Sequence, residues 1–253
     1  MLKLSPSKIR LFTSCGLRYR YEQENPTPFQ TTPAAAFGSF LHAALRRLYE
    51  HPPNASRLEP LLRSVWDENP FTTDEESDVF FAKGLTALKR YCDEFFVDGA
   101  PDSKTIACER FLSFIIERND IAVEFTARAD RLAVADDGAL EIIDYKATLN
   151  GGIQTEESLA TDLVAFLYFG LAKVNHPSYK QFRVRYLNLL SLKSATVEFS
   201  GEQVAANKEA LWREIEKIAR GVFEPRVDEG CSWCPHRSKC PAAGRRIRFE
   251  ELV

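Results

Sequence analysis

Two aspartates and a lysine lie on neighbouring segments that both have the pattern of a β-strand. Asp144 and Lys146 belong to IIDYKA (142–147), and residues i and i+2 of a strand share a face, so their side chains point the same way. The turn signal Asp136-Asp137-Gly138 pairs this strand antiparallel with the preceding one. The resulting register brings Asp130 opposite Asp144.

Two carboxylates beside an ammonium group have the composition of a site for a hard divalent cation. Mg²⁺ and Mn²⁺ prefer oxygen ligands, and such a cation acidifies water and stabilises charge that develops on a phosphate. Lys146 could position the water or stabilise the same charge. The alternative is an exposed strand face with a salt bridge. IIDYKA is otherwise apolar, however, and charges in such a strand are costly unless they are paired or bind a ligand.

A second set of chemically competent residues closes the chain in the pattern C-x₂-C-x₅-C-P, at Cys231, Cys234 and Cys240. Zinc and iron–sulfur sites built from thiolates both need four ligands. The residues that could supply the fourth are Cys15, His236, Cys92 and Cys108. Cys92 and Cys108 lie in an amphipathic and a strand-like run, which is typical of small core residues.

Composition and length predict a folded protein outside the membrane. The chain has 253 residues, 45% of them hydrophobic, which is enough for a sizeable core. No apolar run approaches the roughly 20 residues of a membrane helix, and MLKLSPSKIR has no signal-peptide core. We therefore expect a cytoplasmic location, where six cysteines favour metal binding or burial over disulfides.

The net charge of −3 conceals two basic ends. Residues 1–20 and residues 231–248 each carry five Lys or Arg and no acid. Basic ends on an acidic body favour an anionic partner such as nucleic acid, although terminal basic residues can also be simply solvated.

The remaining chain predicts the elements that must position these residues. Helical patterns cover about 5–21, 37–50, 55–68, 74–97, 156–175 and 201–220. Strand patterns cover 105–116, 121–135, 139–148, 182–190 and 195–200, and the first three predict an antiparallel meander. Together they predict one mixed α/β core.

The stretch ARADRLAVADDGALEIIDYKAT (127–148) resembles the core of the PD-(D/E)XK nuclease superfamily, in its RecB-like branch. FGSFLHAALRRL (37–48) is similar to the histidine helix that precedes that core. LATDLVAFLYFGLA (159–172) resembles the helix that follows the catalytic lysine, where the family usually has Gln-x-x-x-Tyr. This chain departs from the pattern with Val164 in place of the glutamine and with Ala127 where a glycine is usual.

The resemblance implies roles for individual residues. It implies metal ligation by His42, Asp130, Asp144 and the backbone carbonyl of Tyr145. The catalytic set that it implies consists of Asp130, Asp144, Lys146 and Tyr168. Glu109 matches an acidic position that is often seen in this branch and is an accessory candidate.

The same branch includes the AddB subunit and the CRISPR-associated RecB-like exonucleases, which bind a 4Fe–4S cluster through one N-terminal and three C-terminal cysteines. Cys15, Cys231, Cys234 and Cys240 match that arrangement, with zinc at the same cysteines as the alternative. A cluster would join the chain ends and gather their basic side chains into a DNA-binding patch. Its members would be Lys8, Arg10, Arg18, Arg20, Arg237, Lys239, Arg245 and Arg246.

The implied fold is a restriction-endonuclease-like mixed sheet flanked by helices, with an N-terminal helical insertion and a cluster joining the ends. We expect one nuclease domain over 1–253, made of segments 1–34, 35–100, 104–200 and 201–253. The implied function is a metal-dependent exonuclease on single-stranded DNA ends, in repair or CRISPR spacer acquisition. The alternative is a non-catalytic DNA-binding scaffold that works with a helicase or an integrase.

Overall fold

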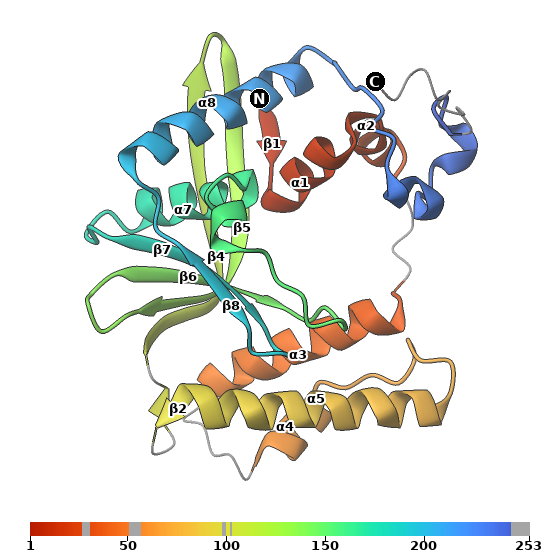
Figure 1. The fold of residues 1–253 in the computed structure, drawn as a ribbon, viewed down its shortest axis with the longest axis vertical. Coiled ribbons are helices and arrows are strands. Elements are labelled where there is room, and N and C mark those ends of the chain that lie inside the picture. Colours follow the sequence, from red (N-terminus) through yellow and green to blue (C-terminus); the bar gives the residue numbers. More distant parts are fainter. Residues whose placement is uncertain (27–30, 51–56, 98–99, 102, 244–253) are drawn as a thin grey trace.

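A mixed β-sheet forms the centre of the computed structural model, which describes residues 1–26, 31–50, 57–97, 100–101 and 103–243 (Figure 1). The strand order is β1-β5-β6-β7-β8, and β4 pairs with β5 on its other side. The strands are β1 (Leu2–Leu4), β4 (Lys104–Arg118), β5 (Ile121–Val134), β6 (Leu140–Lys146), β7 (Phe182–Asn188) and β8 (Ser194–Val197). A separate small hairpin pairs β2 (Phe96–Val97) with β3 (Ala100–Pro101).

The predicted α/β class and the predicted meander are both confirmed. β4 pairs antiparallel with β5, and β5 pairs antiparallel with β6, with Arg131 opposite Ile143. β6 and β7 are parallel, and so are β1 and β5, which makes the sheet mixed. Strand β1 was not predicted, because three residues are too few to display a hydrophobic period.

Two helical layers cover the two faces of the sheet, as the alternation of β6 shows. Ile142 belongs to the core that contains residues of α1 (Pro6–Ser14), α7 (Leu163–Asn175) and α8 (Gly201–Ala219). Ile143 belongs to the other core, with residues of α3 (Pro33–Glu50), α4 (Leu58–Arg63) and α5 (Asp74–Phe95). No helix among the described residues has the length and apolar character that crossing a membrane requires.

Two of the predicted helices are wrong in the same way, because each is interrupted. The helix expected over 5–21 consists of α1 and α2 (Gly16–Glu24), separated by an extended Cys15 with φ of −163°. The helix expected over 156–175 consists of α6 (Glu156–Leu159) and α7. Asp162 starts α7 as an N-cap, since its carboxylate accepts hydrogen bonds from the first free backbone N–H groups.

The two ends of the chain lie side by side. The backbone N–H of Leu17 donates to the carbonyl of Glu224 over 3.2 Å, and the hydroxyl of Tyr21 donates to the carbonyl of Lys239 over 3.2 Å. Gly16 permits this approach, since a Cβ there would lie 3.1 Å from backbone atoms of Glu224. The C-terminal segment adds two short 3₁₀ helices, η2 (Glu229–Trp233) and η3 (Arg237–Lys239).

Candidate metal centre and cysteine cavity

Three residues from three separate elements form a group that could hold a metal ion. His42 comes from α3, Glu109 from β4 and Asp130 from β5, and one ligand atom of each lies within 4.8 Å of the others. The Nδ1 atom of His42 is 3.5 Å from Oδ1 of Asp130. The sheet and the α3 layer therefore bring together the predicted ligands His42 and Asp130 and the accessory candidate Glu109.

Glu109 reaches this group through an unusual backbone conformation. Its φ of 51° lies in the left-handed region, which costs a residue with a side chain on the order of 1–2 kcal/mol. Cys108 pairs with Arg131 and Arg110 with Ala129, so Glu109 stands across from Asp130. The strain is located where two carboxylates meet, which is typical of a functional site.

The carboxylate of Asp130 also holds the end of β6. Its Oδ2 atom accepts a hydrogen bond of 2.7 Å from the backbone N–H of Tyr145. The regular β5–β6 pairing ends at Arg131 and Ile143, one step before Asp130 and Asp144. The side chain of Asp130 thus replaces a ladder hydrogen bond and fixes the peptide between Asp144 and Tyr145.

Asp144, which is buried, forms an ion pair with the half-buried Lys146. Burial raises the pKa of Asp144; the charge of Lys146 opposes that rise and the negative charge of Asp130 adds to it. The Nζ atom of Lys146 also lies 4.7 Å from the centre of the Tyr186 ring. Tyr186 is a neighbour that sequence reasoning missed, because β7 enters the site only through its parallel pairing with β6.

The charge balance around His42 favours a cation. Burial alone would lower the pKa of His42, but its hydrogen bond to Asp130 and the charges of Asp130, Asp144 and Glu109 outweigh burial and raise it. Burial and the charge of Asp130 likewise raise the pKa of Glu109. Carboxylates that resist ionisation when gathered in this way are stabilised by a bound divalent cation.

A cavity of about 630 Å³ opens onto this group. Its lining includes His42, Glu109 and Lys146, and also Arg46 and Arg128, two cations that were not among the predicted site residues. Arg46 follows His42 by one helical turn, and that spacing was the available signal.

Tyr168 and Arg10 also border the buried carboxylates. Tyr168 lies on α7 and is 9% exposed; burial raises its pKa far above the usual range, and the charges of Asp144 and Asp130 add to the rise. The positive charge of Arg10 acts in the opposite direction on Tyr168 and on Tyr186. Helix α1 therefore brings a guanidinium group close to the site.

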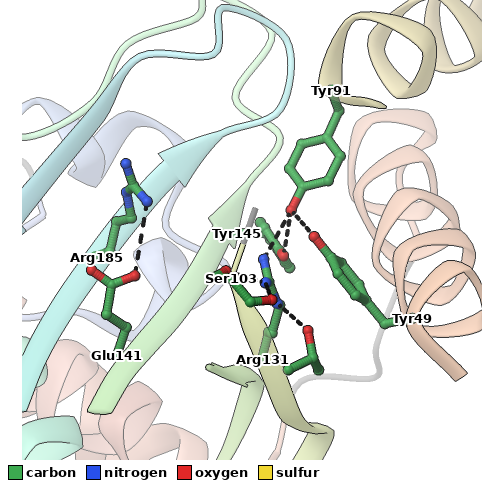
Figure 2. A network of polar contacts seen from close by, with 8 residues as sticks. Tyr49, Tyr91, Ser103, Arg131, Glu141, Tyr145 and Arg185 are labelled. Carbon is green, nitrogen blue, oxygen red and sulfur yellow. Dashed lines mark hydrogen bonds and ion pairs between the residues drawn. The ribbon is translucent and has the colours of Figure 1, made fainter. Parts of the chain in front are cut away.

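The ring of Tyr145 points away from Asp144 and belongs to a buried polar network (Figure 2). Its hydroxyl lies 2.8 Å from the hydroxyl of Tyr91, which lies 2.7 Å from that of Tyr49. Arg131, 2% exposed, donates to Tyr91 over 3.4 Å and stacks 4.1 Å from the Tyr49 ring. Helices α3 and α5 thereby hold the strand that carries Asp144 and Lys146.

We expect Tyr91→Phe to lower the free energy of unfolding by about 1–3 kcal/mol, because it removes the buried hydrogen bonds of the Tyr91 hydroxyl to Tyr145, Tyr49 and Arg131. Urea denaturation of the metal-free protein measures this change. Tyr179→Phe, at a half-buried surface tyrosine, is the matched control and should change stability by less than about 0.5 kcal/mol. Equal losses in the two variants would contradict a special role for the network.

The predicted cysteines share a second, much smaller cavity of about 30 Å³. Its lining includes Cys15, Cys231, Cys234, Cys240 and His236. The backbone N–H of Arg226 donates to Sγ of Cys15 over 3.4 Å, and the thiol of Cys231 donates to the carbonyl of Arg226 over 3.7 Å. In the described part of the chain, however, no three of these sulfur atoms lie within 4.8 Å of one another.

The other two cysteines lie elsewhere, on α5 and β4. Burial raises the pKa of both Cys92 and Cys108 to about 11, so they remain protonated thiols at neutral pH. Nε2 of His236, the alternative fourth ligand, is 2.9 Å from Oε1 of Glu22.

The predicted basic patch is brought together only in part. Arg18 and Arg237 line the cysteine cavity, and Lys239 lies against α2. Arg20 forms an ion pair of 2.7 Å with Glu24, and Lys8 donates to the carbonyl of Lys3. The acidic residue Glu24 of α2 therefore neutralises part of the positive charge of the patch. Arg245 and Arg246 lie outside the described residues.

Comparison with solved structures finds relatives of the same overall fold. A protein from Eubacterium rectale named as a putative exonuclease matches with a TM-score of 0.57 at 11% identity, over 99% of this chain and 92% of its own. A second structure, of SSO0001, matches with a TM-score of 0.46 at 14% identity and covers 95% of this chain and 86% of its own.

Sequence comparison gives two results. No curated protein matches the chain significantly. The sequence profile of the PD-(D/E)XK nuclease superfamily matches residues 3–241, and the chain belongs to that superfamily.

Proposed function

We propose that the protein is a divalent-metal-dependent DNA exonuclease that acts on single-stranded ends. The observation that carries this proposal is the convergence of His42, Glu109 and Asp130 within 4.8 Å, beside a cavity that His42, Glu109 and Lys146 line. The fold shared with the Eubacterium rectale protein, which is named as a putative exonuclease, supports the same class of reaction.

The donor set fits a hard cation, since it combines carboxylate oxygens with one imidazole. The residues that would hold Mg²⁺ or Mn²⁺ are His42, Asp130, Asp144 and the carbonyl of Tyr145, with Glu109 as an accessory acid. Such a cation supplies Lewis acidity towards water and phosphate. The raised pKa values of Asp144 and Glu109 support this assignment, because a bound cation would offset the burial and, to a smaller extent, the charge of Asp130 that raise them.

Lys146 is the proposed catalytic lysine. Its ammonium group, held by Asp144 and by the Tyr186 ring, can donate hydrogen bonds to an oxygen on which charge develops. Tyr168, whose raised pKa keeps it protonated, can donate a hydrogen bond from the α7 side. Val164 stands where the family usually has glutamine, so this chain must orient the DNA with other groups.

We further propose a 4Fe–4S cluster bound by Cys15, Cys231, Cys234 and Cys240. In support, the four cysteines line one cavity, and a backbone N–H points at Sγ of Cys15, as befits a thiolate. A closed zinc site would draw sulfurs to about 3.8 Å from one another, which follows from a Zn–S distance of about 2.3 Å. Among the described residues no three of these sulfur atoms lie within 4.8 Å of one another, which is wider than a closed zinc site requires.

Zinc remains the alternative occupant of the same cysteines. Metal-bound histidines commonly donate a hydrogen bond from their other ring nitrogen to a carboxylate. Nε2 of His236 lies 2.9 Å from Oε1 of Glu22, which is the same kind of contact. Anaerobic purification separates the two occupants: iron and sulfide support the cluster, and zinc in a colourless protein excludes it.

The remaining proposals concern context. We propose one nuclease domain over the whole chain, a role in DNA end processing in repair or CRISPR spacer acquisition, and a helicase or integrase as partner. The adjoining chain ends support the single domain.

Digestion of DNA of defined topology tests the proposed activity. With Mn²⁺ or Mg²⁺, we expect wild-type protein to degrade end-labelled linear single strands and to leave the circular form of the same strand intact. EDTA should stop the reaction. Cutting of the circle would show an endonuclease, and no cutting of either form by protein that contains its cluster would favour the non-catalytic scaffold.

A further inference from the structure

Phe111 is an exposed aromatic side chain on the strand that carries Glu109. Its side chain is 60% exposed, whereas the adjacent Leu112 is 1% exposed and belongs to the core shared with α7. Successive side chains of a strand point to opposite faces, so Phe111 lies on the face away from α7. Exposure alone does not mark a binding site, but Phe111 is the strand partner of Arg128, which lines the large cavity, so the Phe111 ring is available to a molecule bound there.

The strand register places a cation next to this ring. Phe111 lies directly opposite Arg128 in the β4–β5 pairing, and opposed side chains share a face with Cβ atoms about 5 Å apart. Arg128 lines the large cavity, and its Nη1 atom lies 3.7 Å from Oε2 of Glu109. The ring, the guanidinium and the carboxylate of Glu109 therefore follow one another across one face of the sheet.

A second guanidinium faces the same cavity from α3. Arg46 lines the cavity together with His42. Its guanidinium group also forms an exposed ion pair of 3.3 Å with Glu50. Guanidinium groups match the oxygens of a phosphate. The carboxylates could hold a cation, Arg46 and Arg128 could bind a phosphate, and the ring of Phe111 could stack on a base. Together these groups match a phosphodiester whose neighbouring base is unpaired.

We propose that Phe111 and Arg128 bind the nucleotide that adjoins the phosphate to be cut, with its base stacked on the Phe111 ring and its phosphate on Arg128. This inference rests on the proposed nuclease function and deepens it, because it names the structural basis for a single-stranded substrate. A base presents a full face to a ring only when it is unstacked from its neighbours.

Binding rather than cutting provides the test, so that the site and the activity are measured separately. The probe is a fluorescein-labelled single-stranded oligonucleotide, with Ca²⁺ in place of Mg²⁺ or Mn²⁺ to prevent cleavage, and with intact label verified on a gel. Phe111→Ala should weaken binding roughly tenfold, whereas Phe111→Trp should preserve it. The exposure of Phe111 means that both variants should fold, which thermal melting checks.

Ile115→Ala is the matched control, because Ile115 is 63% exposed on the same face of the same strand but carries no ring. It should change the affinity less than about twofold if stacking is the interaction. An oligonucleotide with abasic positions near its end removes the base instead of the ring, so the two changes form a double-mutant cycle. Wild type should lose about as much affinity on that oligonucleotide as Phe111→Ala loses on the normal one, and the two losses should not add.

Arg128→Gln tests the phosphate contact. It should reduce the slope of log K against log salt concentration by about 0.7, on normal and abasic oligonucleotides alike. An unchanged slope would remove Arg128 from the site.

The outcomes are distinguishable from those for the nuclease. Wild-type cutting combined with normal binding by Phe111→Ala overturns this site and leaves the activity in place. Weak binding by Phe111→Ala in a protein that never cuts supports the site and removes the activity. Equal losses by Phe111→Ala and Ile115→Ala, with a dimer dissolving in both, overturn the proposal and assign the face to contact between copies of the chain.

Discussion

Lys146→Ala is expected to lower the rate of DNA hydrolysis by about a hundredfold to a thousandfold, with little change in the fold. Removal of a single preorganised donor to a developing oxyanion typically costs that much. The side chain is about a quarter exposed, so its loss leaves no large cavity. Single-turnover digestion of labelled DNA with Mn²⁺ measures the effect, and far-UV circular dichroism verifies the fold.

The metal affinities of two variants separate the roles of Lys146 and Asp144. Lys146 pairs with Asp144 and competes with a cation for it, so Lys146→Ala should bind Mn²⁺ at least as tightly as wild type. Asp144→Asn should lose both activity and more than about tenfold in Mn²⁺ affinity, because it removes an oxygen ligand. Isothermal titration without DNA reads out the affinities.

Stability gives an independent view of Asp144. Burial raises the pKa of Asp144 above that of an aspartate in the unfolded chain. Asp144 therefore does not destabilise the metal-free fold at pH values below the pKa of the unfolded aspartate. As the pH rises to neutral, ionisation of Asp144 lowers the stability of that fold. Asp144→Asn should therefore melt no lower than wild type without metal, yet gain little from Mn²⁺. Wild type should gain about 2.7 kcal/mol when Mn²⁺ is at a hundred times its dissociation constant.

Lys208→Ala, at an exposed residue of α8, is the control for loss of a lysine and should cut DNA as wild type does. Full activity of Lys146→Ala would refute the catalytic assignment. Normal Mn²⁺ affinity of Asp144→Asn would remove Asp144 from the metal site.

Cys240→Ser is expected to abolish binding of the proposed cluster and thereby to lower the melting temperature by roughly 10–20 °C. A link between Cys15 and the C-terminal cysteines closes a loop of about 200 residues. By analogy with a disulfide, closure of so long a loop is worth on the order of 5 kcal/mol, and each kcal/mol shifts the melting temperature by roughly 2–4 °C at this size. Calorimetry and metal analysis of anaerobically purified protein measure both effects.

Cys108→Ser provides the matched control, because Cys108 lies on β4, outside the cysteine cavity. It should retain the full metal content. A Cys240→Ser variant that keeps its metal and its melting temperature would show that the cysteine cavity holds no structural ligand. Zinc in place of iron and sulfide would keep the stability argument but change the cofactor.

Local sequence patterns determined the part of the site that lies within one hairpin. The alternation of β6 and the turn at Asp136-Asp137-Gly138 predict the register that the structure has, in which Arg131 faces Ile143 and Asp130 comes next to Asp144. A period of two and a short turn are properties of adjacent residues, so they can be read without knowledge of the packing.

Helix boundaries were less predictable, because single side chains decided them. Asp162 starts α7 by capping it, and an extended Cys15 separates α1 from α2. The hydrophobic pattern continues across both breaks, which is why one helix was predicted where two are found. The break at Cys15 matters for function, since it turns the thiol towards the C-terminal segment.

Only the tertiary structure decided the rest of the site. The left-handed backbone of Glu109, the entry of Arg46 and Arg128 into the cavity and the exposure of Phe111 depend on how α3 and the β4–β5 hairpin pack together. These contacts join residues about 60–90 positions apart, and no local period encodes them. The sequence by itself therefore determined which residues could bind a metal, whereas packing decided which cations and which ring surround them.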